Sequence, residues 1–292
     1  AVFREHPDMI LEESDLVDWR ICWKPKAEGL ACLARDLNLG AESFIFLDDS
    51  PAECSQMMSR MPEVLTLQMP ADPAHIPAFL ERTWAFDRVR VTHEDRKRPA
   101  MYRAERKRRE LARQSGREDF LRELGLKVFM APVTPAQVER SAQLSRRTNQ
   151  FHCNPERMSD ERARSLMADS CQEFFALHVT DRFGVYGQTG LVRCRRQNDS
   201  LFVDNFLLSC RVLGRGVENT VLALLAKHCL ESKCRRLVFA FKESGKNQPA
   251  RDFLLSSGGL EQDSGWVFDP HQVAAIPPFV QVFRQHPETG EA

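Results

Sequence analysis

The sequence has 292 residues, of which 42% are apolar, and its 41 basic residues balance 41 acidic ones. This length and apolar content suffice for two domains with a core each, and the zero net charge excludes a global field that recruits nucleic acid or a membrane surface. The nine cysteines form no C-x-x-C pair and no zinc-type Cys/His spacing. This pattern excludes a disulfide framework and favours a reducing, cytoplasmic location. No apolar run reaches the roughly 18 residues of a membrane span.

Residues 1–92 alternate between helical and strand-like segments. The spacing of apolar residues predicts a helix over 26–37, a short buried strand over 43–47, a second strand over 64–68 and a helix around 75–83. Strands that alternate with helices are typical of a parallel sheet.

A strongly charged stretch predicts a helical connector over 93–124. One interpretation is a solvated helix stabilised by pairs of opposite charge four residues apart. The other is a docking face for an acidic carrier protein.

Residues 125–292 predict a mixed sheet. The expected elements are strand 126–131, helix 134–147, hairpin strands 174–180 and 188–194, strand 201–208, helix 217–231, strand 236–241, helix 248–256 and strand 265–268. Strand 201–208 leads through the R-x-x-G-x-G loop at 211–216 into a helix. This order resembles the GNAT acyltransferase fold, in which the corresponding loop holds a pantetheine-bearing ligand.

Two adjacent carboxylates, Asp48 and Asp49, follow the first predicted strand. The carboxyl end of a parallel strand is where such folds place ligands, and magnesium is held by one or two carboxylates together with water and phosphate oxygens. Lys26, at the start of the preceding helix, is suited to neutralise a phosphate. The alternative is structural, because Asp, Ser and Pro also suit a turn that ends a strand and starts a helix.

The segments WKPK (23–26) and FLDDSPAE (46–53) resemble the third and fourth motifs of haloacid dehalogenase (HAD)-type phosphatases. That class also has a D-x-D-x-T nucleophile loop upstream, which this sequence does not contain. Residues 1–6 read as the middle of a helix without a cap, so we expect natural sequence before them. The predicted fold class is α/β, with a partial HAD-like Rossmannoid parallel sheet followed by a GNAT-like mixed-sheet domain.

Cys210 stands between strand 201–208 and the glycine-containing loop. Backbone N–H groups at Gly214 and Gly216, together with Arg211 and Arg215, are suited to bind a pyrophosphate or a phosphopantetheine arm. The same cations and the following helix N-terminus favour a thiolate, the nucleophilic form of cysteine. This pattern predicts acyl transfer to or from a carrier thiol, and the alternative is a buried structural cysteine.

Further polar residues are candidates to complete this site. We expect Asn149 to hydrogen-bond a hydroxyacyl group, His152 to take a proton and Asp181 to orient a base. Lys246 and Asn247 are candidate phosphate or pantetheine contacts. Each of these residues is equally typical of a helix cap or a turn.

The motifs taken together resemble the FkbH-like family over nearly the whole chain. The matching segments are HPDM (6–9), WKPK (23–26), LNLG (37–40), FLDDSPAE (46–53), THEDR (92–96), TNQF (148–151), DRFG (181–184), SCRVLGRGVE (209–218) and KN (246–247). Members of that family join a HAD-like phosphatase domain to a GNAT-like acyltransferase domain. They occur in polyketide pathways, alone or within large synthases.

The resemblance implies that the chain loads a three-carbon acyl unit, of glyceryl or lactyl type, onto the phosphopantetheine thiol of an acyl carrier protein. The implied donor is 1,3-bisphosphoglycerate, with loss of phosphate. It implies Cys210 as the acyl-accepting nucleophile, Asp48 or Asp49 as a ligand of Mg²⁺, and Lys26 as a phosphate contact. Two alternatives stay open: a coenzyme A-dependent GNAT N-acyltransferase in which Cys210 is structural, and a non-catalytic module that docks a carrier protein.

Overall fold

The computed structural model describes residues 2–6, 8–12, 15–37, 39–87, 93–148, 150–263 and 265–283. The chain divides into two compact units, Ala1–Lys107 and Arg108–Ala292. The elements of the first unit are α1 (Val2–Glu5), α2 (Lys26–Leu37), η2 (Ala41–Ser43), β1 (Ile45–Asp48), α3 (Pro51–Arg60), β2 (Leu65–Gln68), η3 (Pro73–His75), α4 (Ile76–Glu81) and η4 (Trp84–Phe86). Helix α5 (His93–Gln114) begins in the first unit and ends in the second.

The first unit contains a parallel pair of strands. β1 and β2 pair in the register Ile45↔Leu65 to Asp48↔Gln68, and α3 connects them. The helices α2 and α3 pack their apolar faces together in a small core that includes Ala27, Leu30 and Met57. The predicted βαβ arrangement is confirmed.

The second unit contains a single mixed sheet of eight strands in the order β10-β3-β4-β5-β6-β7-β9-β8. The β10·β3 and β6·β7 pairs are parallel, and the other neighbours are antiparallel. Its elements are α6 (Arg117–Leu124), β3 (Leu126–Pro132), η5 (Pro135–Gln137), α7 (Val138–Arg147), α8 (Asp160–Met167), β4 (Glu173–Asp181), β5 (Gly184–Gln197), β6 (Ser200–Leu208), η6 (Cys210–Val212), α9 (Val217–Glu231), β7 (Arg236–Phe239), α10 (Gln248–Ser256), β8 (Leu260–Gln262), β9 (Gly265–Phe268) and β10 (Val280–Phe283). A parallel sheet followed by a larger mixed sheet confirms the predicted α/β class.

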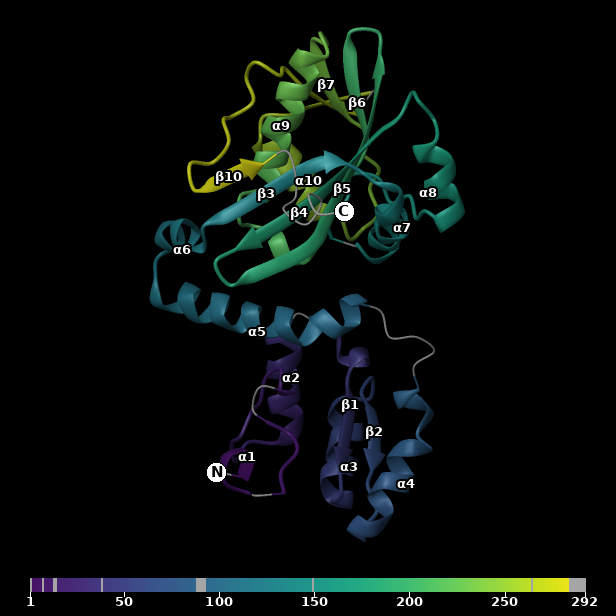
Figure 1. The fold of residues 1–292 in the computed structure, drawn as a ribbon, viewed down its shortest axis with the longest axis vertical. Helices are drawn as coiled ribbons and strands as arrows, with labels where there is room; N and C mark the ends of the chain where they lie inside the picture. The colour runs from purple at the N-terminus through teal and green to yellow at the C-terminus, as the bar shows by residue number, and fades with distance from the viewer. Residues whose placement is uncertain are drawn as a thin grey trace. The chain divides into compact units, whose positions relative to one another are not determined.

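Helices cover both faces of the eight-stranded sheet (Figure 1). On one face, Val221 and Leu225 of α9 pack against Val192 of β5 and its neighbours in the main core. On the other, α7 and α8 pack against a second cluster that includes Leu191. Adjacent residues of one strand therefore enter different cores, which explains why the central strands read as continuous apolar runs rather than as an alternation.

The charged stretch predicted as a helical connector over 93–124 is helical in the structure. The chain forms two helices, and Gly116 is the N-cap of α6. Glycine has a low helix propensity, and the backbone of Gly116 is extended. Helix α5 therefore ends at Gln114, and α6 begins at Arg117. The sequence also gave no expectation of α8, β8 or β10.

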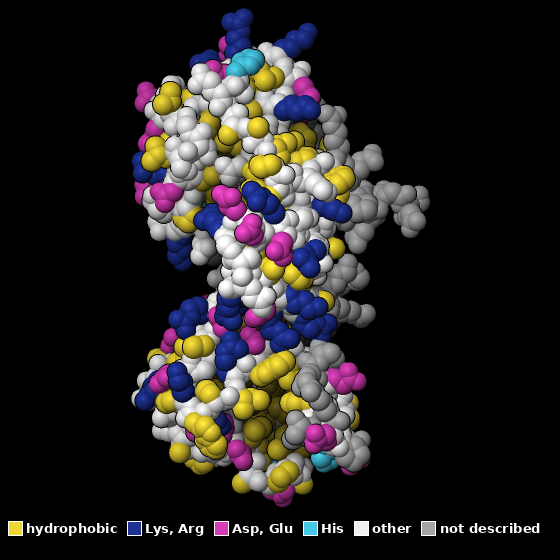
Figure 2. All heavy atoms as spheres, turned by 90° about the vertical axis from the view of Figure 1, so that its left-hand side faces the viewer, with side chains coloured by type: hydrophobic (Ala, Val, Ile, Leu, Met, Phe, Trp, Pro, Cys, Tyr) yellow, Lys and Arg dark blue, Asp and Glu magenta, His cyan; other side chains and the backbone are white. Residues whose placement is uncertain are grey.

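Charged side chains of both signs are interspersed with hydrophobic ones on the face shown in Figure 2, in keeping with the zero net charge. Large hydrophobic side chains are exposed in the first unit, among them Ile10, Ile21, Trp23 and Trp84. None of the described helices combines the length and the apolar composition needed to cross a bilayer.

Gly190 of β5 provides a test of the packing between β4 and β6. A Cβ at this position would lie 2.7 Å from both Leu177 Cδ1 and Leu208 Cδ2 and 2.8 Å from Leu207 O. We therefore expect Gly190→Ala to lower the free energy of unfolding by about 1 to 3 kcal/mol, as overpacked cores do, measured by urea denaturation. Gly116→Ala is the control, because its Cβ would come no closer than 3.9 Å to its neighbours. Equal stability of the two variants would contradict the packing described.

Candidate functional site

The Asp48 carboxylate lies at the carboxyl end of β1 and is buried. The Ser50 backbone N–H donates to Asp48 Oδ1 at 3.0 Å, and Ser50 also caps α3. Lys26 Nζ, from the first residue of α2, donates to Asp48 Oδ2, whereas Asp49 is exposed. The structure thus confirms the turn that ends β1 and starts α3. It also shows a hydrogen bond between Lys26, the expected phosphate contact, and Asp48, one of the two expected metal ligands.

The charge state of Asp48 follows from these contacts. Burial alone would raise its pKa, but the hydrogen bonds from Lys26 and from the Ser50 backbone bring the pKa below its ordinary value. The hydrogen bond to Asp48 raises the pKa of Lys26 in turn. A pair of adjacent carboxylates, one of them ionised and ordered, fits Mg²⁺ held by one or two carboxylates with water in its other positions.

Cys210 lies directly after β6, as the first residue of η6, and it is exposed. The loop is anchored on both sides of the thiol, because the Ser209 N–H donates to Thr189 O at 2.7 Å and Val212 is fully buried. Arg211 Nε donates to Ser209 Oγ at 3.2 Å. The alternative interpretation of Cys210 as a buried structural residue is wrong, since a fixed loop presents this thiol to solvent.

A carboxylate of the chain itself occupies part of the predicted phosphate-binding loop. The Gly214 N–H donates to Glu218 Oε1 at 2.6 Å, and Glu218 is buried in the first turn of α9. Burial raises the pKa of Glu218, although hydrogen bonds from the backbone of Glu218, Gly214 and Gly216 oppose the rise. The expectation that Gly214 offers an unpaired N–H group to a phosphate is therefore wrong.

Glu218 is a residue that the sequence interpretation missed. Acidic side chains are favourable in the first turn of a helix, because they interact with its unpaired N–H groups. The glutamate two positions after Gly216 carried that signal. Gly214 and Gly216 have φ angles of 71° and 81°, which favour glycine and allow the tight loop that brings Glu218 back to Gly214.

Asp181 is the acceptor of a buried hydrogen-bond network. Arg108 donates to both of its oxygens, Nε to Oδ2 at 2.6 Å and Nη2 to Oδ1 at 2.9 Å. Tyr186 OH donates to Oδ2 at 2.7 Å, and the backbone N–H groups of Phe183 and Gly184 donate to Oδ1 at 2.9 and 3.1 Å. The side chains of Arg108 and Asp181 are 3% and 0% exposed. The structure therefore gives Asp181 an organising role, and its orientation of a catalytic base stays a prediction.

Tyr186 connects this network to the loop that carries Cys210. Arg215 Nη1 donates to Tyr186 OH, and the guanidinium carbons of Arg108 and Arg215 lie 3.9 and 5.4 Å from the centroid of the Tyr186 ring. Arg215 thus contributes cation–π packing and a hydrogen bond to Tyr186, and its expected effect on a thiolate at Cys210 stays a prediction.

His152 and Asn247, which the sequence suggested separately, lie together. Asn247 Nδ2 donates to His152 O and to Lys242 O, both at 3.0 Å, and Ser244 Oγ lies 3.4 Å from His152 Nε2. Asn247 is buried at the start of α10, and its Oδ1 accepts the Ser244 N–H at 2.9 Å. Asn247 is therefore a cross-link between two loops, while Lys246 is exposed.

The segment 151–153 fills the space beside the end of β6. The Cys153 N–H donates to Phe206 O and the Leu208 N–H donates to Phe151 O, each at 3.0 Å. On its other side, the Lys242 N–H donates to Cys153 O at 2.8 Å. β5 pairs with the opposite edge of β6 as far as Leu208. At this end of β6 both edges of the strand are therefore hydrogen-bonded as far as Leu208. An extended ligand cannot pair with β6 here without displacing the segment.

The structure thus places the expected site residues in groups, two of which meet at Arg215. Asn149 lies outside the described residues. The groups are Lys26 with Asp48 and Asp49 in the first unit, and, in the second, His152 with Asn247, Asp181 with Arg215 through Tyr186, and the loop of Cys210, Arg211, Gly214 and Gly216.

No protein-family model matches the chain, and no curated protein matches it. Solved structures match parts of it. The N-terminal part of a Bacteroides fragilis protein, containing a phosphatase domain complexed with Mg, is 29% identical over 30% of this chain and 24% of its own, with a TM-score of 0.29. This chain therefore spans about a quarter of the length of that structure.

Acetyltransferases match about half of the chain. Spermidine N-acetyltransferase from Vibrio cholerae, in complex with CoA and spermine, is 13% identical over 48% of this chain and 91% of its own, with a TM-score of 0.37. The ribosomal-protein-S18-alanine N-acetyltransferase from Escherichia coli is 13% identical over 48% of this chain and 88% of its own, with a TM-score of 0.37.

The Lys26–Asp48 pair predicts an altered acid titration when Lys26 is replaced. In the native protein the lowered pKa of Asp48 makes its ionisation stabilising above the unfolded-state pKa of about 3.9, and this contribution is lost as the pH falls through the folded-state pKa. In Lys26→Met the hydrogen bond that lowers the pKa of Asp48 is lost, while burial still raises that pKa. We therefore expect the pKa of Asp48 to rise. Carbon-detected NMR titration of the carboxyl group measures it. Lys24→Met, at an exposed neighbour, should leave the pKa of Asp48 unchanged, and an unchanged value in Lys26→Met would refute the pairing.

Proposed function

We propose that this chain transfers a three-carbon acyl unit from 1,3-bisphosphoglycerate through a thioester at Cys210 to the phosphopantetheine thiol of an acyl carrier protein. The observation that carries the proposal is the exposed Cys210 thiol, which an anchored loop presents at the end of a central strand. The family resemblance of the sequence supplies the substrate class. The proposal places the chain in polyketide biosynthesis, by itself or as part of a larger synthase.

The chemistry consists of two acyl transfers. The Cys210 thiolate attacks the carbonyl carbon of the acyl phosphate, a C–S bond forms, and the C–O bond to the phosphate breaks with release of inorganic phosphate. The thiol proton passes to a base, for which His152 is the candidate. The carrier thiol then attacks the thioester carbonyl carbon, and Cys210 recovers its proton as the acyl carrier product leaves. Asn149 and Asp181 are proposed to position the acyl group and the base.

The packing around β6 supports an approach from the loop side. Segment 151–153 covers one edge of β6 and β5 covers the other, so we expect a pantetheine arm to approach Cys210 from the loop, with Arg211 as a contact, rather than along the strand. Lys246 is exposed and available to a phosphate of that arm. A carrier tethered within the same synthase needs only weak docking, because its effective concentration reaches the millimolar range.

Asp48 and Asp49 are proposed to hold Mg²⁺ in the HAD-like unit, with Lys26 beside them as a phosphate contact. When bound there, the ion would neutralise the charge of a phosphate ester. Lys26 keeps Asp48 ionised and ordered through its hydrogen bond. Since the sequence contains no D-x-D-x-T loop, removal of the ester phosphate is the step that these residues do not complete by themselves.

Intact-protein mass spectrometry tests the thioester step. After incubation with 1,3-bisphosphoglycerate we expect an added phosphoglyceryl or glyceryl mass on the native chain and none on Cys210→Ala. Cys171→Ala removes another exposed cysteine and should keep the adduct. Pantetheine should release it, as thiols release thioesters.

Three outcomes would overturn this function. An adduct that persists in Cys210→Ala would mean that another group is acylated. Acetylation of an amine by acetyl-coenzyme A with equal rates in the native chain and in Cys210→Ala would establish the N-acyltransferase alternative. A native chain that binds a carrier protein but forms no adduct would leave the docking module as the function.

A further inference from the structure

Three side chains with metal-binding atoms meet in the second unit: Glu173 begins β4, Cys194 lies in β5, and His228 lies in the last turn of α9. Their ligand atoms all lie within 4.8 Å of one another. Glu173 and Cys194 are direct cross-strand partners, so their side chains leave the same face of the sheet. That face is the one covered by α9, which supplies His228.

The contacts within this cluster leave it suited to a cation. His228 Nε2 lies 2.9 Å from Glu173 Oε2, and Arg196 Nε lies 3.5 Å from Glu173 Oε1. Cys194 is fully buried. A thiol, an imidazole and a carboxylate are the three ligand types that zinc takes in proteins.

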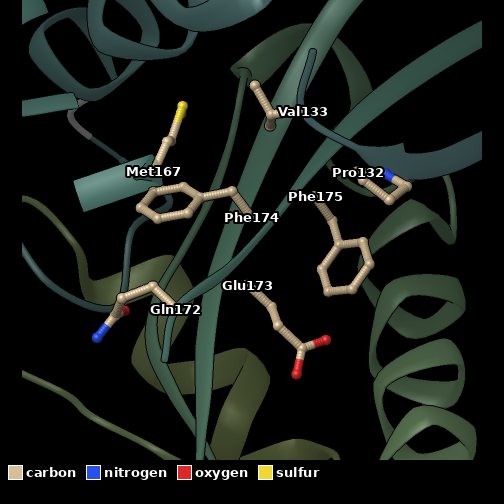
Figure 3. Close-up of a pocket in the computed structure, with 7 residues that line it drawn as sticks. All are labelled: Pro132, Val133, Met167, Gln172, Glu173, Phe174 and Phe175. Carbon is tan, nitrogen blue, oxygen red and sulfur yellow. The ribbon is translucent and has the colours of Figure 1, made fainter. Parts of the chain in front are cut away.

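A cavity of about 300 Å³ borders the cluster, and Glu173 and Phe175 are among the residues that line it. Figure 3 shows the Glu173 carboxylate and the Phe175 ring extending to the same side of β4. The Phe175 ring packs edge-on against His228, with centroids 5.4 Å apart and an interplanar angle of 75°. Glu173 therefore belongs both to the cluster and to the lining of the cavity.

We propose that Glu173, Cys194 and His228 form a zinc site whose fourth position opens toward this cavity. Around a tetrahedral zinc ion, with bonds of about 2.0 to 2.3 Å, the ligand atoms stand about 3.3 to 3.6 Å apart. The Glu173–His228 pair already lies near that separation, and the cysteine sulfur needs to approach by at most about 1.2 Å.

Binding of zinc replaces the present contacts of the three side chains with bonds to the ion. The Cys194 thiol loses its proton to solvent as the Zn–S bond forms, and the hydrogen bond between His228 and Glu173 gives way to two bonds to the ion. Arg196 stays on Glu173 and orients it, as outer-shell partners of metal ligands do. Three protein ligands and one open position make the site suited to water or to a small anionic ligand that enters from the cavity. The ligands are scattered along the chain, which explains why sequence spacing did not reveal them.

The test uses the full chain, freed of metal with a chelator and titrated with Zn²⁺ in competition with a chromophoric chelator. We expect one zinc ion per chain, and a loss of affinity of more than about 100-fold in Cys194→Ala and in His228→Gln. Cys229→Ala, at a buried cysteine next to His228 in sequence, is the matched control and should bind zinc as the native chain does. Arg196→Gln should weaken binding by about tenfold.

A second measurement keeps the proposal falsifiable if Cys194→Ala fails to fold. Loading with Co²⁺ should give a thiolate-to-metal charge-transfer band in the native chain, retained in Cys229→Ala and absent in His228→Gln, whose folding is checked by circular dichroism. Zinc bound at Asp48 and Asp49 would persist in Cys194→Ala and His228→Gln and would give no such band, and that result would overturn the proposal. Absence of zinc binding by the native chain would overturn it equally.

Discussion

The buried ion pair between Arg108 and Asp181 is the interaction on which the arrangement of the second unit depends. It joins the last turns of α5 to the turn between β4 and β5, and through Tyr186 it reaches Arg215 in the loop after Cys210. Removing two charges from water is costly, and only a complete set of hydrogen bonds offsets that cost. Here both carboxylate oxygens are engaged by more than one donor. The loop that presents the proposed nucleophile is therefore held from a distance by electrostatics.

The same loop is held locally by groups that a ligand would otherwise use. Glu218 accepts a hydrogen bond from the Gly214 N–H, and segment 151–153 hydrogen-bonds to one edge of β6. Both contacts leave the Cys210 thiol exposed while they limit the directions from which a substrate reaches it. A phosphate that binds at this loop has to compete with the Glu218 carboxylate for the Gly214 N–H.

Local patterns predicted most of the fold, because the strands and helices carry their own periodicity. The β4–β5 hairpin, β6 and α9 follow from apolar runs and from the glycines between them. What local patterns could not give is pairing between distant segments: β10 joins β3, and Phe151 and Cys153 join β6. The place of Cys210 after a strand predicted a reactive thiol and left a buried structural cysteine open, and the partners of Asp181 and Gly214 were not predicted. Arg108 lies in a helix that reads as solvated, and only the tertiary structure shows that one of its charges is buried.

A double-mutant cycle on Arg108 and Asp181 tests this account most directly. The free energies of unfolding are measured by urea denaturation for Arg108→Met, Asp181→Asn and the double variant. We predict that each single change costs about 3 to 5 kcal/mol, because it leaves a buried charge without its partner, and that the double variant costs clearly less than the sum of the two. Additive and small effects would contradict the account, since they would mean that the pair does not organise the second unit.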